Sequence, residues 1–224
     1  MERSTAVAAS DGGASDRMGR TERKRRAILQ AAEALFLDRG FVGASVEDVA
    51  VRAAVSKQTI YKQFESKAAL FVAVVQDMTG EAADRVQVEM ADPQTEADVV
   101  RALMGHGERL LSIVLTPRLL RLRRLVISET DRFPELGRAL YEGGPGRAIA
   151  GLAAALQRWA ERGLLALDEP MVAATQFNWL VMGDPVNRAM FFGAVHLTAG
   201  EQERHLTQGV RVFLAAYRRP PATG

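Results

Sequence analysis

The sequence predicts an all-α protein, with an N-terminal three-helix helix-turn-helix head and a C-terminal antiparallel helical bundle. Apolar residues recur at the spacing of helix turns in one segment after another, and no segment alternates apolar and polar residues as a half-buried strand would. Ser or Thr precedes many of these apolar stripes, often with an acidic residue three positions later, which is typical of helix starts.

The head is predicted from helix starts and stops that follow one another closely. Helices are expected over 24–38, about 46–53, roughly 57–63 and from Lys67 onward, with Gly40 as a stop and Ser45, Ser56 and Ser66 as N-caps. Only three or four residues join the second and third helices, so these two should cross steeply in helix-turn-helix geometry.

The rest of the chain predicts longer helices that pack as a bundle. They are expected over 68–90 with an interruption at Gly80, over 95–115, from Thr116-Pro117 onward, within 132–147 between two proline-marked breaks, over 146–162 up to Gly163, over 169–182, and from Thr198 to about Tyr217. We therefore expect a disordered N-terminal arm (1–20), a head (21–67), a bundle (68–218) and a short tail (219–224).

Positive charge is concentrated at one end of the chain. The net charge is only +2, yet residues 17–67 hold 11 Lys and Arg against 6 Asp and Glu. All four lysines, Lys24, Lys57, Lys62 and Lys67, lie before residue 68. A basic patch on a near-neutral body fits an anionic partner, although a solvated charged face explains the same pattern.

Composition and motifs argue against several other classes of protein. The lack of cysteine excludes disulfides and cysteine-ligated metals, and it fits a cytoplasmic location. The start has no apolar core of a signal peptide, and Pro117 and four arginines break the most apolar stretch, so no membrane span is expected. With no G-x-S-x-G elbow, P-loop or metal-ligand pattern, we expect no enzyme and no cofactor. A helical scaffold that binds acidic protein or membrane is a further alternative.

The segment VSKQTIYKQFESK, residues 55–67, is more polar than a packed helix needs to be. Its few apolar anchors are Val55, Ile60 and Phe64. Its polar side chains at helical spacing, within an arc of roughly 140°, are Lys57, Gln58, Tyr61 and Lys62. Lysines neutralise phosphates, glutamine bonds base edges, and hydroxyls bond phosphate oxygens. These residues fit a DNA-reading helix, and they also fit a polar helix that merely covers a small core.

Residues 25–71 resemble the N-terminal domain of TetR-family transcriptional repressors, through LF…RGF, SVEDVA, VSKQTIYKQF and SKAALF in the same order. The resemblance implies a homodimer that binds a palindromic double-stranded DNA operator, each recognition helix (57–63) entering the major groove of one half-site. It also implies that the bundle binds a small effector. The residues expected to bind DNA are Ser45, Ser56, Lys57, Gln58, Thr59, Tyr61, Lys62 and Lys67.

Two residues depart from the commonest pattern of that family. Ala54 stands in the turn where glycine is usual, which would cost on the order of 1 kcal/mol if this residue needs a positive φ. Gln58 stands where many members have glycine, and it offers an extra side chain for reading a base.

Residues 123–156 resemble the AefR-like subset of TetR C-terminal domains, a likeness that implies the fold but not the effector. By family analogy, the helices around 169–182 and 200–217 should form the dimer interface. Polar or large side chains on apolar faces are candidates for the effector pocket, although ordinary core packing explains each one singly. They are Met104, His106, Trp159, Phe177, Asn178, Met182 and Phe191. Few positive charges fall on these faces, which favours a largely apolar effector. The arginines of 118–124 fit the surface best, with an inter-domain contact or an anion site as alternatives.

Overall fold

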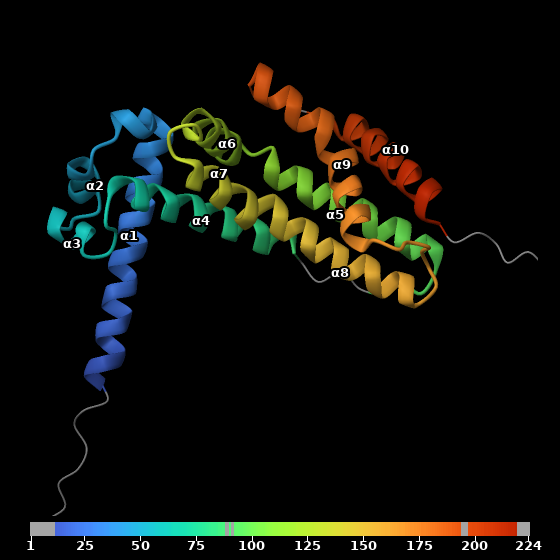
Figure 1. Ribbon diagram of the computed structural model, residues 1–224, viewed down its shortest axis with the longest axis horizontal. Coiled ribbons are helices and arrows are strands. Elements are labelled where there is room, and N and C mark those ends of the chain that lie inside the picture. The colour runs from blue at the N-terminus through green and yellow to red at the C-terminus, as the bar shows by residue number, and fades with distance from the viewer. Residues whose placement is uncertain (1–11, 88–89, 91, 194–196, 219–224) are drawn as a thin grey trace, which may run out of the picture. The chain divides into compact units, whose positions relative to one another are not determined.

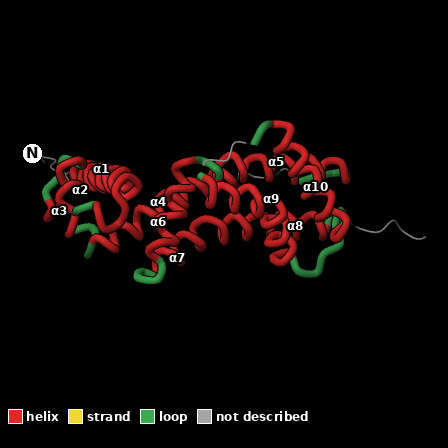
Figure 2. The backbone as a smooth tube through the Cα atoms, turned by 90° about the horizontal axis from the view of Figure 1, so that it is seen from above, coloured by secondary structure: helices red, strands yellow, loops and turns green. Residues whose placement is uncertain are grey.

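The protein is all-α in the part of the chain that the structure describes. The computed structural model describes residues 12–87, 90, 92–193 and 197–218. Figure 2 shows helices joined by loops throughout these ranges, and no strand among them. An isolated antiparallel bridge joins Leu165 to Arg218. The predicted fold class is therefore confirmed.

The chain forms two compact units, the first ending at Val74 and the second beginning at Val75. The first unit contains α1 (Gly12–Gly43), α2 (Val46–Arg52), α3 (Lys57–Tyr61) and the beginning of α4 (Lys67–Val86). The boundary thus falls inside α4, whereas the sequence placed it between residues 67 and 68.

Helix α1 begins earlier than predicted. Its backbone is helical from Gly12, so residues 12–20 are not the disordered arm expected for 1–20, and 1–11 lie outside the described residues. Extending a helix costs little once it is nucleated, because each added residue gains a backbone hydrogen bond. The predicted stop is at the right place, since Gly40 has φ 72° and ψ 177° and interrupts the helical backbone.

Aromatic side chains hold the core of the first unit together. The ring centroids of Phe36 and Phe71 lie 4.7 Å apart, and those of Phe41 and Phe71 lie 5.5 Å apart. Ile60 of α3 is also fully buried, with 1% of its surface exposed. A helix as short as α3 gains little from its own hydrogen bonds, so this burial is what fixes it in place.

The second unit contains the rest of α4 and the later helices. These are α5 (Glu96–Val114), α6 (Pro117–Glu129), α7 (Pro134–Tyr141), a π-helical turn (Glu142–Gly146), α8 (Arg147–Glu161), α9 (Pro170–Phe192) and α10 (Ala199–Tyr217). Capping boxes open α5 at Thr95 and α10 at Thr198. Two predicted interruptions are wrong: α4 continues through Gly80, and Pro145 lies in the π-helical turn that connects α7 to α8. A wider π-helical turn accommodates a proline because it already departs from the regular hydrogen-bond ladder.

Helix α9 is the central element of the bundle. It packs against α5, α8 and α10, and Figure 1 shows these helices lying alongside one another. Trp159, Phe177 and Phe213 are buried where they meet, with 0–1% of their surface exposed. Phe177 and Phe213 make an edge-on contact at 5.2 Å between ring centroids.

Candidate nucleic-acid interface and effector cavity

Three hydroxyl side chains hold the helix starts of the head. The Ser45 hydroxyl accepts a hydrogen bond from the backbone N–H of Asp48 at 3.0 Å. The Ser56 hydroxyl accepts one from the backbone N–H of Thr59 at 3.1 Å and also bonds the Thr59 hydroxyl at 2.9 Å. Ser45 and Ser56 therefore cap the N-termini of α2 and α3, a role that each of them fills without DNA.

The polar arc of α3, defined as Lys57, Gln58, Tyr61 and Lys62, faces solvent in the structure. Phe64 and Ile60 are buried beneath it, with 5% and 1% of their surface exposed, and Val55 is half-buried. The side chains of Gln58 and Lys62 have no hydrogen bond or ion pair with other described residues. Both side chains are thus available to an outside partner.

Two of the predicted DNA-binding lysines are already engaged within the head. Lys57 forms an ion pair with Glu47 of α2, and its amine lies 5.8 Å from the centre of the Tyr61 ring. The hydrogen bond between Lys57 and Glu47 lowers the pKa of the Glu47 carboxyl and raises the pKa of Lys57. Lys67 donates to the backbone carbonyl of Val42 at 3.3 Å. These lysines orient α3 and α4 as well as adding positive charge.

The turn between α2 and α3 is a Schellman motif with alanine in the left-handed position. Ala54 has φ 52°, and it is the one non-glycine residue with positive φ in the described ranges. The Val55 N–H donates to the Ala50 carbonyl at 3.0 Å, and the Ala54 N–H donates to the Val51 carbonyl at 3.2 Å. This position favours glycine because a Cβ is strained at positive φ. The strain that the sequence predicted for Ala54 if its φ were positive is therefore present.

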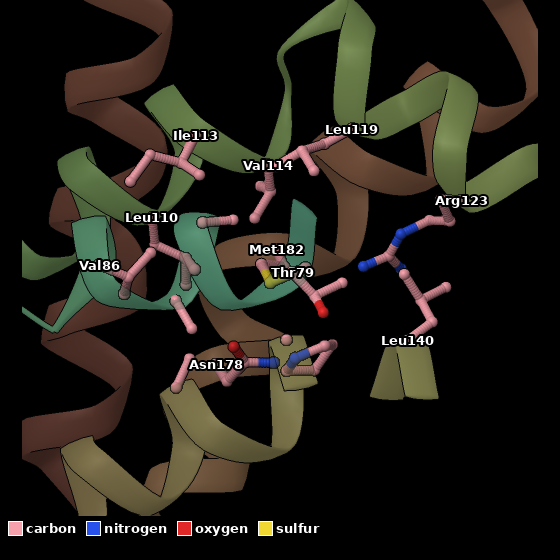
Figure 3. A pocket seen from close by; sticks show the side chains of 15 residues that line it. Thr79, Val86, Leu110, Ile113, Val114, Leu119, Arg123, Leu140, Asn178 and Met182 are labelled. Carbon is pink, nitrogen blue, oxygen red and sulfur yellow. The ribbon is translucent and has the colours of Figure 1, made fainter. Parts of the chain in front are cut away.

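An apolar cavity lies inside the second unit, between α4, α5, α6, α8 and α9 (Figure 3). The cavity itself has a volume of about 60 Å³, within a hollow of about 570 Å³ that includes the part open to solvent. Most of the wall is aliphatic, and it includes Val86, Leu110, Ile113, Val114, Leu119 and Leu140. Three polar side chains also line the cavity: Thr79, Arg123 and Asn178. A concave, mostly apolar space with a few polar groups is the usual form of a small-molecule site.

Two of the predicted pocket residues, Asn178 and Met182, line this cavity. His106 lines a different hollow, on the side of Gln87 and Asp92, and burial lowers the pKa of its ring to about 4. The remaining candidates lie elsewhere: Trp159 and Phe177 in the core, Met104 half-buried against it, and Phe191 on the surface.

Phe191 requires a correction, because 76% of its surface is exposed and it lies outside the cavity. An apolar residue near a helix end carries no sequence signal that separates a cavity wall from an exposed face. Sequence reasoning also did not single out Arg123 among the arginines of 118–124, for which it favoured the surface and kept an inter-domain contact or an anion site as alternatives.

Helix α9 exposes an unusual amount of apolar surface. Its exposed apolar residues are Met171, Val172, Trp179, Phe191 and Phe192, with 42–78% of their surface exposed. Part of the circumference of α9 is therefore open to solvent, while the rest is buried in the core. Large exposed apolar patches on a folded chain usually mark an interaction site.

A helix-turn-helix head with an exposed cationic arc, joined to a helical bundle with an apolar cavity, is the arrangement typical of a DNA-binding transcriptional regulator. Residues 28–74 match the model of bacterial regulatory proteins of the tetR family, and residues 101–219 match that of the AefR-like transcriptional repressor C-terminal domain. The chain therefore belongs to the TetR family, with an AefR-like C-terminal domain. None of the described helices is both long and apolar enough to cross a membrane.

Relatives of this chain include two regulators with solved structures and a transcriptional activator. A TetR-family transcriptional regulator from Mesorhizobium loti is 37% identical, with a TM-score of 0.82 over 89% of this chain and 99% of that one. The flavonoid-responsive regulator FrrA is 32% identical, with a TM-score of 0.75 over 89% and 100%. The transcriptional activator FasR of Mycolicibacterium smegmatis is 41% identical over 61 residues, which is 27% of this chain and 27% of FasR.

Proposed function

We propose that this protein is a ligand-responsive repressor that binds a palindromic operator as a homodimer. The observation that carries the proposal is the polar arc of α3, which is exposed and includes two unpaired side chains, Gln58 and Lys62. Gln58 would hydrogen-bond a base edge in the major groove, and Lys62 would neutralise a phosphate. Ser45, Ser56 and Thr59 would hold the helix starts against the backbone, and Tyr61 and Lys67 would contact phosphates.

The homodimer would form through the exposed apolar face of α9 together with α10. Trp179 on α9 and Val212 on α10 have 57% and 50% of their surface exposed, which is costly for a monomer in water. A Trp179→Glu variant should shift the protein towards monomer in sedimentation velocity. Its control is Tyr141→Glu, because Tyr141 has an equal 57% of its surface exposed and lies on α7, which packs against α6 and the π-helical turn. A Trp179→Glu variant that stays dimeric would place the interface elsewhere.

The effector would bind in the cavity between α4 and α9. Its largely aliphatic wall supports an apolar ligand, and the flavonoid-responsive relative FrrA supports a small organic molecule as the signal. An effector weakens operator binding only if it binds the DNA-free conformation more tightly than the DNA-bound one. Because α4 begins in the head, movement of this helix would couple the cavity to the DNA-binding surface.

Activation is the second candidate function, and the name of the relative FasR favours it. The two functions differ in one measurement, the transcription of the target promoter with and without the regulator gene. A repressor raises transcription when it is deleted, whereas an activator lowers it.

The test of DNA reading starts with selection of bound fragments from the source genome, followed by a footprint. Gln58→Ala should cost about 1–3 kcal/mol on the selected site and relax the choice of one base pair. Lys62→Ala should weaken binding to all sequences. It should also reduce the slope of log affinity against log salt concentration by about 1, as expected for the loss of one phosphate contact. Gln30→Ala, an exposed glutamine on α1, is the control and should change neither. A symmetric footprint is expected, and equal loss on all sequences for Gln58→Ala would refute base reading.

A further inference from the structure

Arg123 differs from the other arginines of its run in what its side chain contacts. Arg118 pairs with Glu81 at 2.8 Å, Arg124 donates to the Ala189 carbonyl at 2.9 Å, and Arg121 is exposed. Arg123 instead lines the apolar cavity and is only partly exposed. Among the described residues, no carboxylate or carbonyl accepts a hydrogen bond from its guanidinium.

A half-buried arginine without a partner is an unfavourable arrangement in an apolar setting. Removing the guanidinium from water penalises its charged form, and burial accordingly lowers the pKa of Arg123. A guanidinium cannot escape this cost by losing its proton, because it stays charged at physiological pH. An anion in the cavity would offset the cost, since paired and hydrogen-bonded charges are the ones that proteins bury.

Asn178 is a second polar group aimed into the same space. Only 4% of its surface is exposed, and its side-chain amide has no hydrogen bond with any described residue. Figure 3 shows the Asn178 amide and the Arg123 guanidinium on different sides of the cavity, both pointing inward. By contrast, the Thr79 hydroxyl already donates to the Val75 carbonyl at 2.8 Å. The cavity therefore offers one cation and one free amide in an otherwise aliphatic wall.

We propose that the cavity takes an amphipathic organic anion, whose apolar body lies against α4, α5 and α6 and whose acidic group binds Arg123. A carboxylate suits the planar, forked guanidinium best, because it accepts two parallel hydrogen bonds. Asn178 then bonds a second polar atom on the body of the ligand. This inference rests on the proposed effector role of the cavity and sharpens the earlier expectation of a largely apolar ligand to an acid.

The direct test measures binding of three probes with the same eight-carbon chain to the full-length protein without DNA, by isothermal titration calorimetry. The probes are octanoate, 1-octanol and octylamine, which are negative, neutral and positive at pH 7. Octanoate should bind about tenfold to a hundredfold more tightly than 1-octanol, as expected for hydrogen bonds to a charged group, and octylamine should bind most weakly. Equal binding of octanoate and 1-octanol, or no binding by octanoate, would overturn the proposal.

Two variants test whether Arg123 causes the preference for octanoate over 1-octanol. Arg123→Met keeps most of the side-chain volume and should abolish the difference between octanoate and 1-octanol. Arg121→Met, on the exposed side of the same helix, should preserve that difference. A preference that survives in folded Arg123→Met would show that another group binds the acid and would refute the assignment. Because wild-type protein alone tests the charge preference, the proposal stays falsifiable if Arg123→Met does not fold.

DNA release is scored separately, so that the two proposals can fail independently. Octanoate that binds through Arg123 but leaves the operator complex intact would support the anion site and count against its effector role. A neutral compound that releases the operator from wild-type protein, alongside equal binding of octanoate and 1-octanol, would support the effector role and refute the anion site.

Discussion

Ala54 is the residue whose replacement by glycine should stabilise the head. It occupies the left-handed position that ends α2, with φ 52°, and its side chain is exposed. The Ala54→Gly change therefore removes a strained Cβ and leaves the core intact. Both backbone hydrogen bonds of the turn can form with glycine, because they involve main-chain atoms only.

Two opposing effects set the magnitude. Holding a non-glycine residue in the left-handed region costs about 1–2 kcal/mol, and glycine removes this cost. Glycine also makes the unfolded chain more flexible, which favours unfolding by about 0.4–1 kcal/mol. The net expectation is a stabilisation of about 0.5–1 kcal/mol. If the two units unfold together, this corresponds to a rise in Tm of roughly 1–4 °C for a chain of this size.

The assay is urea unfolding of wild type and two variants, followed by circular dichroism. The control is Ala53→Gly, because Ala53 is adjacent, is the C-cap of the same helix, and has φ −82°. At that ordinary φ glycine brings only its entropic cost, so Ala53→Gly should destabilise by about 0.5–1 kcal/mol. Variants that shift stability in the same direction, or an Ala54→Gly protein less stable than wild type, would refute the assignment of strain to this turn.

Three further predictions concern charge and packing. Acid should destabilise the protein as the pH falls from about 6.5 to about 4, by up to about 3 kcal/mol, because neutral, buried His106 must gain its proton on unfolding. His106→Phe should flatten that pH dependence in urea unfolding, and an unchanged slope would refute the cause. Glu47→Gln should tighten operator binding about two- to fivefold in a gel-shift titration, since it frees Lys57 and removes a negative charge near the polar arc. Weaker binding would show that the ion pair between Lys57 and Glu47 is needed to orient α3. Gly143→Ala should destabilise the protein by about 1–3 kcal/mol, because its Cβ would lie 2.5 Å from the Thr79 hydroxyl oxygen. The control Gly80→Ala, with open space around its Cβ, should stabilise the protein. Equal effects of the two variants in thermal unfolding would contradict the packing argument.

The head could be predicted closely because its signals are local. Ser45 and Ser56 cap the helices that follow them, Gly40 breaks α1, and the spacing of Ile60 and Phe64 sets which side of α3 is buried. Each of these features depends on a few neighbouring residues, which sequence displays directly. The helical start of α1 at Gly12 was missed because helix extension is cooperative and depends on the segment that follows, not on composition alone.

The cavity could be predicted only in part, because it depends on how distant helices meet. Asn178 and Met182 were found as large or polar residues on an apolar face. The same rule also selected Trp159, which is completely buried in the core. Periodicity identifies which face of a helix turns inward. It cannot identify where the inward faces of several helices leave space between them.

The inward position of Arg123 on α6 could have been recognised from the spacing of its neighbours, although a count of the charges in 118–124 does not reveal it. Four arginines in 118–124 suggest a solvated surface, yet their positions on the helix are not equivalent. Leu120, Leu122 and Val126 of α6 are buried, and Leu119, one turn before Arg123, lines the cavity. An arginine bracketed at helical spacing by such residues must either reach past them to water or meet a partner inside. Its guanidinium meets no partner among the described residues, and for this reason the binding of an acid is the property of the cavity that most needs to be measured.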